Sequence, residues 1–220
     1  ARRTGRGRTW QVSDFTPSYE LVTDLVRTHG GVVKFGPGLP YGLVADDLDA
    51  TWVSDRHDAV EVSLWGPGGS AERSAVVLPT GDRLVVDAEA EAGVGGLGRW
   101  LVEPDPAVIR AEDVDTLAVR IGGRRLARQI AYLVCDEPVA TPYGTVFEVL
   151  ESFAWKEKLL RAWVRDHDIG TLEIKKRGIE VDPSQLRRRL KLSGTASATV
   201  VITPTPEGAR VLVVRRVVTG

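Results

Sequence analysis

The chain has 220 residues, of which 43% are hydrophobic and 27% charged, and its formal net charge at pH 7 is −1. This composition is typical of a soluble globular protein, and the length allows one large domain or two small ones. No apolar run approaches the ~18 residues that a membrane-spanning helix needs, and no signal peptide precedes the first expected element, so we expect neither membrane insertion nor secretion. The single cysteine, Cys135, cannot pair within the chain and fits a reducing, cytoplasmic setting.

The charges are unevenly distributed. Residues 46–115 contain 16 acidic and 5 basic side chains, whereas residues 156–192 contain 11 basic and 6 acidic ones. A molecule of this kind can hold a polyanion at one end without being basic overall. The alternative is that these charges only solvate helix faces.

The chain begins with Ala1 and contains no methionine. We therefore expect it to be a fragment of a longer protein.

The first 90 residues predict one helix and several short strands. The helix is expected to begin at Thr16–Pro17 and to end at the glycines 30–31. Its expected apolar stripe consists of Leu21, Val22, Leu25 and Val26. Alternating or apolar runs predict strands at residues 32–35, 51–54, 59–65, 74–78 and 83–87, the last two as a hairpin.

Residues 88–98 are interpreted as a linker with few hydrogen bonds. Their Gly-x-Gly-x-x-Gly spacing at residues 93–98 matches a phosphate-binding loop, but no apolar strand precedes it and no acidic ribose-binding residue follows in a strand.

The remainder predicts a second domain. A single helix is expected from Asp105–Pro106 to Ile121, followed by strands at 129–134 and 145–155. A helix over 156–168 should place Leu159, Leu160, Trp163 and Val164 toward a core. A strand at 170–176, a helix capped by Asp182 and strands at 198–203 and 210–217 complete the pattern.

The most distinctive segment is GTLEIKKRG at residues 170–178, followed by VDPSQLRRRL at 181–190. Together with WLVEPDPAVIRA at 100–111, it resembles the C-terminal part of a bacterial family of class I S-adenosylmethionine-dependent methyltransferases that carry a THUMP-like domain. The resemblance is best over residues 98–217. It implies an α/β fragment over 1–90, the C-terminal part of a Rossmann-like methyltransferase sheet ending in an antiparallel hairpin, and an α+β THUMP-like domain over 98–220.

The resemblance also implies a function. The parent protein would transfer a methyl group from S-adenosylmethionine to RNA, with tRNA or rRNA as candidates. The cofactor loop and the N-terminal half of the catalytic domain would lie before Ala1, so we expect this chain alone to bind no cofactor and to be inactive. Arg2 and Arg3 would be the remnant of a catalytic Asp-Pro-Ala-Arg-Arg motif.

The candidate RNA-binding residues are cations from three neighbouring elements. Lys176 has the strand parity of the core face, where burial would be costly, so the strand is expected to end there and to expose its cations. The full set is Lys175, Lys176, Arg177, Arg187, Arg188, Lys191, Lys158 and Arg161.

The sequence also leaves other functions open. Phe153, Trp155 and Trp163 could stack on bases, although core packing is the favoured interpretation for Trp163. His29, His57 and His167 lack metal-ligand spacing, so no metal is expected. The chain could instead be a non-enzymatic RNA-binding or adaptor module, or a protein-docking domain that uses its acidic middle segment.

Overall fold

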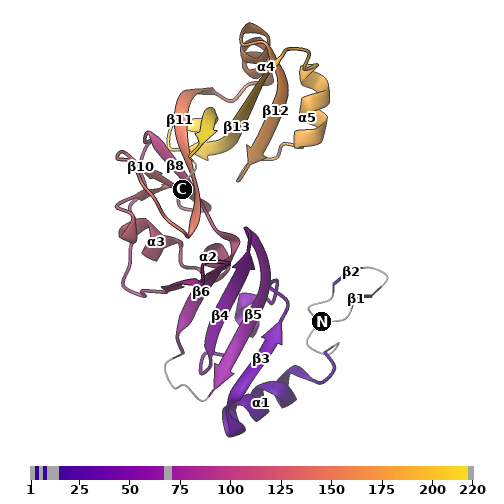
Figure 1. Cartoon of the computed structure of the whole chain (residues 1–220), viewed down its shortest axis with the longest axis vertical. Coiled ribbons are helices and arrows are strands. Elements are labelled where there is room, and N and C mark those ends of the chain that lie inside the picture. The colour runs from indigo at the N-terminus through magenta and orange to yellow at the C-terminus, as the bar shows by residue number, and fades with distance from the viewer. Residues whose placement is uncertain (1–2, 5–6, 9–14, 67–70, 218–220) are drawn as a thin grey trace. The chain divides into compact units, whose positions relative to one another are not determined.

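The computed structural model describes residues 3–4, 7–8, 15–66 and 71–217, and the chain divides into two compact units. The first unit consists of Ala1–Ala90 and Asp105–Leu117, and the second of Glu91–Pro104 and Ala118–Gly220. Figure 1 follows the chain through both. The domain limits expected from the sequence, 1–90 and 98–220, stay a prediction about independent folding.

The first unit is built on a five-stranded sheet with the strand order β3-β5-β4-β6-β7. Its strands are β3 (Gly31–Phe35), β4 (Asp49–Asp55), β5 (Asp58–Gly66), β6 (Arg73–Leu78) and β7 (Asp82–Val85). Only β4 and β6 pair in parallel; the other neighbours are antiparallel. The order leaves β3 and β7 as the edges of the sheet. The short strands β1 (Arg3–Thr4) and β2 (Gly7–Arg8) pair separately with each other.

Helix α1 (Tyr19–His29) begins later than the sequence predicted and buries a different face. Its N-cap is Ser18, whose hydroxyl accepts a hydrogen bond from the Leu21 backbone at 3.2 Å. Thr23 and Val26 are buried, whereas Leu21 and Leu25 are 52% and 49% exposed. The predicted apolar stripe was therefore wrong for both leucines. The Thr23 hydroxyl donates to the Tyr19 carbonyl at 2.9 Å, which allows this polar side chain to be buried.

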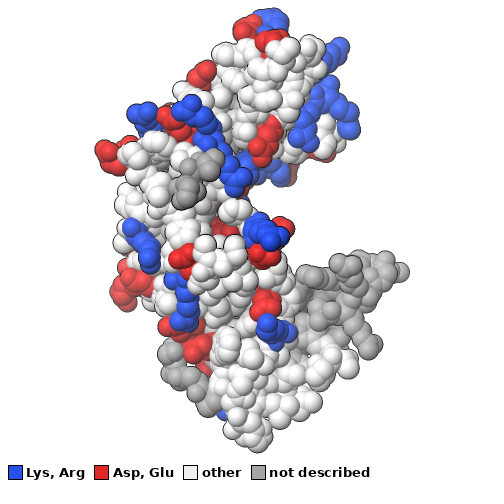
Figure 2. Space-filling model, in the orientation of Figure 1, with Lys and Arg blue, Asp and Glu red and all other residues white. Residues whose placement is uncertain are grey.

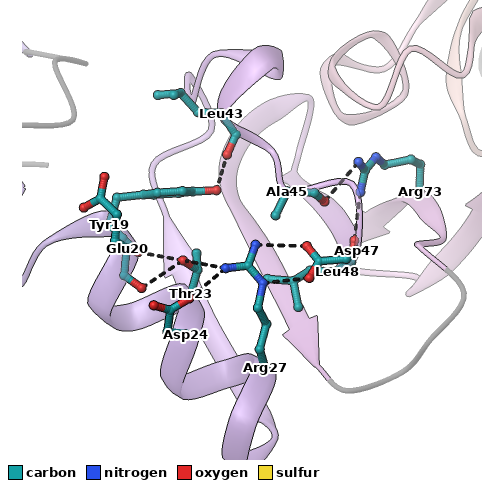
Figure 3. A network of polar contacts seen from close by, with 10 residues as sticks. All are labelled: Tyr19, Glu20, Thr23, Asp24, Arg27, Leu43, Ala45, Asp47, Leu48 and Arg73. Carbon is teal, nitrogen blue, oxygen red and sulfur yellow. Dashed lines mark hydrogen bonds and ion pairs between the residues drawn. The ribbon is translucent and has the colours of Figure 1, made fainter.

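A polar network ties α1 to the segment that contains the 3-10 turn η2 (Tyr41–Leu43) and leads into β4 (Figure 3). The Arg27 guanidinium contacts Asp24 at 2.9 Å and Asp47 at 2.7 Å, and the Tyr19 hydroxyl donates to the Leu43 carbonyl. From the other side, Arg73 donates to the Leu48 carbonyl at 2.9 Å. The segment is thus anchored both to the helix and to β6.

The helix expected from Asp105 to Ile121 is broken in two. α2 (Pro106–Arg110) starts at the predicted N-cap, where the Asp105 carboxylate accepts from the Ala107 backbone at 2.9 Å. α3 (Val114–Arg120) follows after a turn in which Glu112 has a φ of 59°. A single helix cannot pass through a left-handed residue, so the prediction of one helix was wrong.

The second unit is built on a seven-stranded sheet with the order β12-β13-β14-β11-β8-β10-β9. Its strands are β8 (Trp100–Pro104), β9 (Arg124–Ala127), β10 (Ile130–Cys135), β11 (Gly144–Ala154), β12 (Ile169–Lys176), β13 (Ala196–Thr205) and β14 (Gly208–Arg216). β12 and β13 pair in parallel, with α5 (Pro183–Leu190) as the crossover between them. β12 and β9 form the two edges of this sheet.

Both faces of the seven-stranded sheet carry apolar cores. On one face, α4 (Glu157–Asp166) and α5 contribute Leu160, Val164, Leu186 and Leu190. These side chains pack with residues of the strands, namely Leu172, Ile174, Val200, Ile202, Val211 and Val213. The second core contains Leu101, Tyr132, Phe147, Val201 and Leu212. Leu159, which the sequence placed in the core, is 41% exposed.

Residues 93–98 are not the loosely held linker that the sequence predicted. Gly93 and Gly95 exchange backbone hydrogen bonds with Arg125, at 2.8 and 3.0 Å. A Cβ atom on Gly98 would lie 2.4 Å from the Cys135 carbonyl oxygen. These contacts show that the segment lies close to β9 and the end of β10, and that Gly98 is needed for this close approach.

Candidate nucleic-acid interface

The candidate interface begins at the end of β12. The strand alternates between buried Leu172 and Ile174 and exposed neighbours, and its last residue is Lys176. Lys176 has the parity of the core face but is exposed, as expected, because the strand ends there. Its ammonium group makes no hydrogen bond or ion pair to any other residue that the structure describes. Its charge is therefore available to a ligand.

The two neighbours of Lys176 have a different environment. Lys175 Nζ lies 2.8 Å from Glu103 Oε2, and an Arg177 guanidinium nitrogen lies 3.9 Å from Glu103 Oε1. The three side chains are 28%, 34% and 20% exposed for Lys175, Arg177 and Glu103 respectively. Part of the positive charge expected at this surface is thus neutralised by a carboxylate on β8.

Aromatic rings complete the surroundings of these two cations. The Lys175 ammonium lies 5.6 Å from the centre of the Phe147 ring, and the Arg177 guanidinium lies 5.3 Å from that of Tyr132. Both distances suit a cation–π contact. Burial raises the pKa of the Tyr132 hydroxyl, and the nearby negative charge of Glu103 raises it further. Sequence reasoning missed this cluster, although both motifs that form it, EPD and KKRG, belong to the segments that carry the family resemblance.

Helix α5 presents further cations, and its start follows the sequence prediction. The Asp182 carboxylate accepts from the backbone of Ser184 at 2.8 Å and of Gln185 at 3.0 Å. The hydrogen bond from Gln185, and then that from Ser184, lowers the pKa of Asp182. Because Leu186 and Leu190 point into the core, Arg187 and Arg188 are exposed.

The cations of α4 are partly used within the protein. Glu157 accepts from Arg161 at 2.8 Å and from Arg189 at 2.9 Å, which joins α4 to α5. Lys158 is exposed and, among the described residues, has no hydrogen-bond or ion-pair partner. In Figure 2, Lys and Arg side chains gather over the part of the second unit where Figure 1 labels α5.

The aromatic candidates lie close to this helix pair. Trp163 is half-buried, packs against the core, stacks on His167 with ring centres 4.5 Å apart and donates to Glu151 at 3.1 Å. Phe153 and Trp155 are also half-buried and pack against the same core. These contacts favour a packing role for all three.

The side chains of Arg2 and Arg3, the expected remnant of a catalytic motif, lie outside the described part of the structure. Arg2 lies outside the described residues, and only the backbone of Arg3 is described, in β1 opposite Arg8. The Gly93–Gly98 spacing has no strand directly before it, so it does not fit a cofactor loop of the dinucleotide-binding type. Cys135, the single cysteine, is buried. In the described part of the chain, no three His, Cys, Asp or Glu side chains gather as a metal site would require.

The comparisons with known proteins agree with the predicted resemblance. Residues 144–216, from the start of β11 to the end of β14, match the family described as THUMP domain-like. These residues form a THUMP-like domain. It contains α4, α5 and most of the candidate cations.

Relatives extend the likeness to the rest of the chain. The chain is 37% identical, over 209 residues, to uncharacterized S-adenosylmethionine-dependent methyltransferases from two strains of Mycobacterium tuberculosis. The match covers 92% of this chain and 58% of each relative, so the chain spans little more than half of their length. The predicted resemblance to this methyltransferase family is therefore confirmed.

A solved structure supports the fold. The crystal structure of a protein described as a candidate methyltransferase from Porphyromonas gingivalis matches with a TM-score of 0.75 and 18% identity. The match covers 94% of this chain and 56% of that one. The expected architecture, a mixed α/β fold with a THUMP-like α+β part, is confirmed.

Among the residues that the structure describes, no helix combines the length and the apolar character needed to cross a bilayer.

Proposed function

We propose that this chain works within an S-adenosylmethionine-dependent methyltransferase that modifies RNA, and that its THUMP-like domain docks the RNA. The identity to the M. tuberculosis methyltransferases supports the reaction type. The match of residues 144–216 to the THUMP domain-like family supports the docking role. The single cysteine, which is buried, supports a cytoplasmic location.

One observation carries the RNA-docking proposal. Lys176, Arg187 and Lys191 belong to the THUMP-like domain, are all exposed and have no ion-pair partner among the described residues. Arg188 is exposed beside them in α5, and its charge contributes to the lowered pKa of Asp182. Unpaired cations gain most from phosphate, since they give up no carboxylate partner on binding. Lys175 and Arg177 belong to the proposed surface as well, but RNA would compete there with Glu103.

The edge of the first unit supports a longer catalytic sheet. β3 is an edge strand, so one side of its backbone has no strand beside it among the described residues. Val32 on β3 and Trp65 opposite it on β5 are 43% and 45% exposed. We propose that the N-terminal half of a catalytic domain extends the sheet from β3 and covers these side chains.

Cofactor binding is proposed to need that N-terminal half. Titration calorimetry of this chain with S-adenosylmethionine is expected to give no heat of binding. Micromolar affinity would show that this chain contains a cofactor site, and would contradict the proposal that cofactor binding needs the N-terminal half of the catalytic domain.

RNA docking is tested by filter binding of a single-stranded RNA across a salt series. Lys176→Ala combined with Arg187→Ala removes two exposed cations from the proposed surface. For single-stranded RNA, the log–log slope of affinity against salt should become shallower by about 0.7 for each phosphate that is no longer neutralised. The stability of the domain should change by less than about 1 kcal/mol.

A matched control removes the same charge elsewhere. Arg110→Ala combined with Arg128→Ala also deletes two exposed cations, one on α2 and one in the turn between β9 and β10. Both double variants have the same net charge, so only the position differs. If the log–log slope of affinity against salt is the same for the two double variants, Lys176 and Arg187 do not contact RNA phosphates and are only solvated. If this chain binds RNA but the full-length protein shows no methyltransferase activity, the two results together would favour the adaptor function.

A further inference from the structure

A basic pocket lies between one side of α4, from Lys158 to Arg165, and the C-terminal end of α5. Its volume is about 610 Å³, within the range of small-molecule sites. Four cations line it: Lys158, Arg161 and Arg165 from α4, and Lys191 at the end of α5. Ser193 adds a hydroxyl, and no aromatic side chain is among the lining residues.

The pocket retains a positive charge after its internal ion pairs are considered. Arg161 is paired with Glu157 and Arg165 with Asp166, each at 2.8 Å. Lys158 and Lys191 have no partner among the described residues. Asp168 also lines the pocket, but one of its oxygens already accepts from the Thr195 backbone at 3.1 Å and the Thr195 hydroxyl at 2.6 Å. Two unpaired ammonium groups therefore remain for an anion, against the single carboxylate charge of Asp168, whose pKa the hydrogen bonds from Thr195 lower.

The wall of the pocket is preformed by close backbone packing. A Cβ atom on Gly170 would lie 1.8 Å from the Gly194 carbonyl oxygen, and one on Gly194 would lie 1.9 Å from the Asp168 carbonyl oxygen. Only glycine at both positions allows the segment after α5 to lie so close to the start of β12. Glu157, which bonds both Arg161 and Arg189, holds the two helices together. The backbone wall of the pocket and the Arg161 side chain are thus held in place before any ligand binds.

Lys191 has an unusual backbone for its residue type. It is the C-cap residue of α5 and has a φ of 53° and a ψ of 55°, in the left-handed region. Glycine or asparagine is the usual residue in this conformation at a helix end, because other side chains are strained there. Glycine at this position would therefore remove the ammonium group and relieve the backbone strain at the same time.

We propose that this pocket binds a phosphate group, carried either by the RNA backbone or by a free nucleotide. Cations without aromatic neighbours suit phosphate rather than a base, so recognition there would not depend on sequence. If the phosphate belongs to the RNA backbone, this inference rests on the proposed RNA docking and names one of its contact sites. It assigns roles to Arg165 and Ser193 in addition to Lys158, Arg161 and Lys191.

The decisive variant is Lys191→Gly, because it removes the ammonium and also relieves the backbone strain. It should melt at the same temperature as the wild type or slightly higher, yet bind RNA about 3- to 10-fold more weakly, with a salt slope shallower by about 0.7. Lys158→Gln should weaken binding in the same way. Arg128→Ala, at the opposite edge of the sheet, is the charge-matched control. If the two pocket variants match Arg128→Ala in affinity and slope, the pocket proposal is overturned.

Competition by adenosine monophosphate and by inorganic phosphate identifies the source of the phosphate. Competition that disappears in Lys191→Gly indicates a free phosphate monoester. Pocket-dependent RNA binding without such competition indicates the RNA backbone. If the wild type binds adenosine monophosphate through the pocket but binds no RNA, the phosphate site is supported and the proposed RNA-docking function is contradicted. If the wild type binds neither adenosine monophosphate nor RNA, both the phosphate site and the RNA-docking function are contradicted.

Discussion

The two units expose different kinds of side chain. Of the large apolar side chains that are exposed among the described residues, eight lie in the first unit and four in the second. The first set is Leu21, Leu25, Val32, Tyr41, Val60, Trp65, Leu78 and Val85, and the second is Val94, Val119, Leu150 and Leu159. The second unit instead exposes the cations of α4, α5 and the end of β12.

The difference follows from how each sheet is covered. The seven-stranded sheet of the second unit has an apolar core on both faces, with α4 and α5 on one of them. Its apolar side chains are therefore largely buried within the unit. The first unit leaves Val32 and Trp65 exposed near the edge strand β3. The second unit therefore buries most of its large apolar side chains within itself, whereas the first exposes an apolar surface that suits a further packing partner.

The strongest test of the second unit is truncation of its core side chains. Leu172→Ala combined with Ile174→Ala removes two side chains that are 2% and 7% exposed. Each truncation of a buried Leu or Ile costs about 2–5 kcal/mol, so the double variant should lose several kcal/mol in chemical denaturation. Leu159→Ala, on the exposed face of α4, should change stability by less than about 1 kcal/mol. Similar losses for both variants would contradict the assigned core.

The next effect concerns a buried carboxyl group in the first unit. Asp113 is fully buried, and the nearby Thr116 hydroxyl, which does not reach either carboxylate oxygen within normal hydrogen-bond geometry, offsets only part of the cost of burying the charge. Burial raises its pKa from 3.8 to about 6, with a further contribution from the negative charge of Asp87. The folded state thus holds this proton more tightly than the unfolded state. Stability from this group is present below pH ~4 and is lost as the pH rises to about 6.

Asp113→Asn removes this titration. The wild type should lose up to about 2 kcal/mol relative to the variant between pH 4 and pH 7. The comparison is made by urea denaturation at each pH, so that groups with lowered pKa, such as Asp47 and Asp182, cancel. A constant difference between the two proteins over this range would argue that Asp113 is charged when folded.

A smaller effect is expected from Glu103, which joins β8 to Lys175 and Arg177. Glu103→Gln removes the carboxylate that two half-buried cations share, leaves Lys175 only its 4.0 Å contact with Glu173, and should destabilise the second unit by about 1–2 kcal/mol. Because it also frees both cations, it should strengthen RNA binding if they face the ligand. Glu207→Gln, which removes a more exposed pair with Arg210, is the control and should cost less than about 1 kcal/mol. Weaker RNA binding by Glu103→Gln would show that the carboxylate positions the cations.

The smallest effect is expected on the exposed face of α1. Leu21→Gln combined with Leu25→Gln changes side chains that are about half exposed, and Gln has nearly the same helix propensity as Leu. Thermal stability should change by less than about 0.5 kcal/mol for each substitution, and aggregation should decrease. A large loss of stability in this chain would mean that the face is already packed, and would weaken the contrast between the two units.

The sequence alone determined most of the local structure and the exposure of Lys176 at the end of β12. Period-2 alternation predicted β5 and β12, and an Asp-Pro pair predicted the starts of both α2 and α5. These features are local, since strand alternation and helix capping depend on residues a few positions apart. The placement of Lys176 at an exposed strand end was predicted for the same reason.

The tertiary structure decided which charges remain available. Glu103 and Lys175 are 72 residues apart, and only the order of strands in the sheet brings them together. The same holds for the close approach of Gly98 to Cys135, which turned an apparent linker into a packed segment. Burial of Thr23 instead of Leu21 was also a tertiary outcome, because the face that α1 turns to its sheet depends on distant partners. A sequence shows which side chains are charged or apolar, but their partners depend on contacts between distant segments.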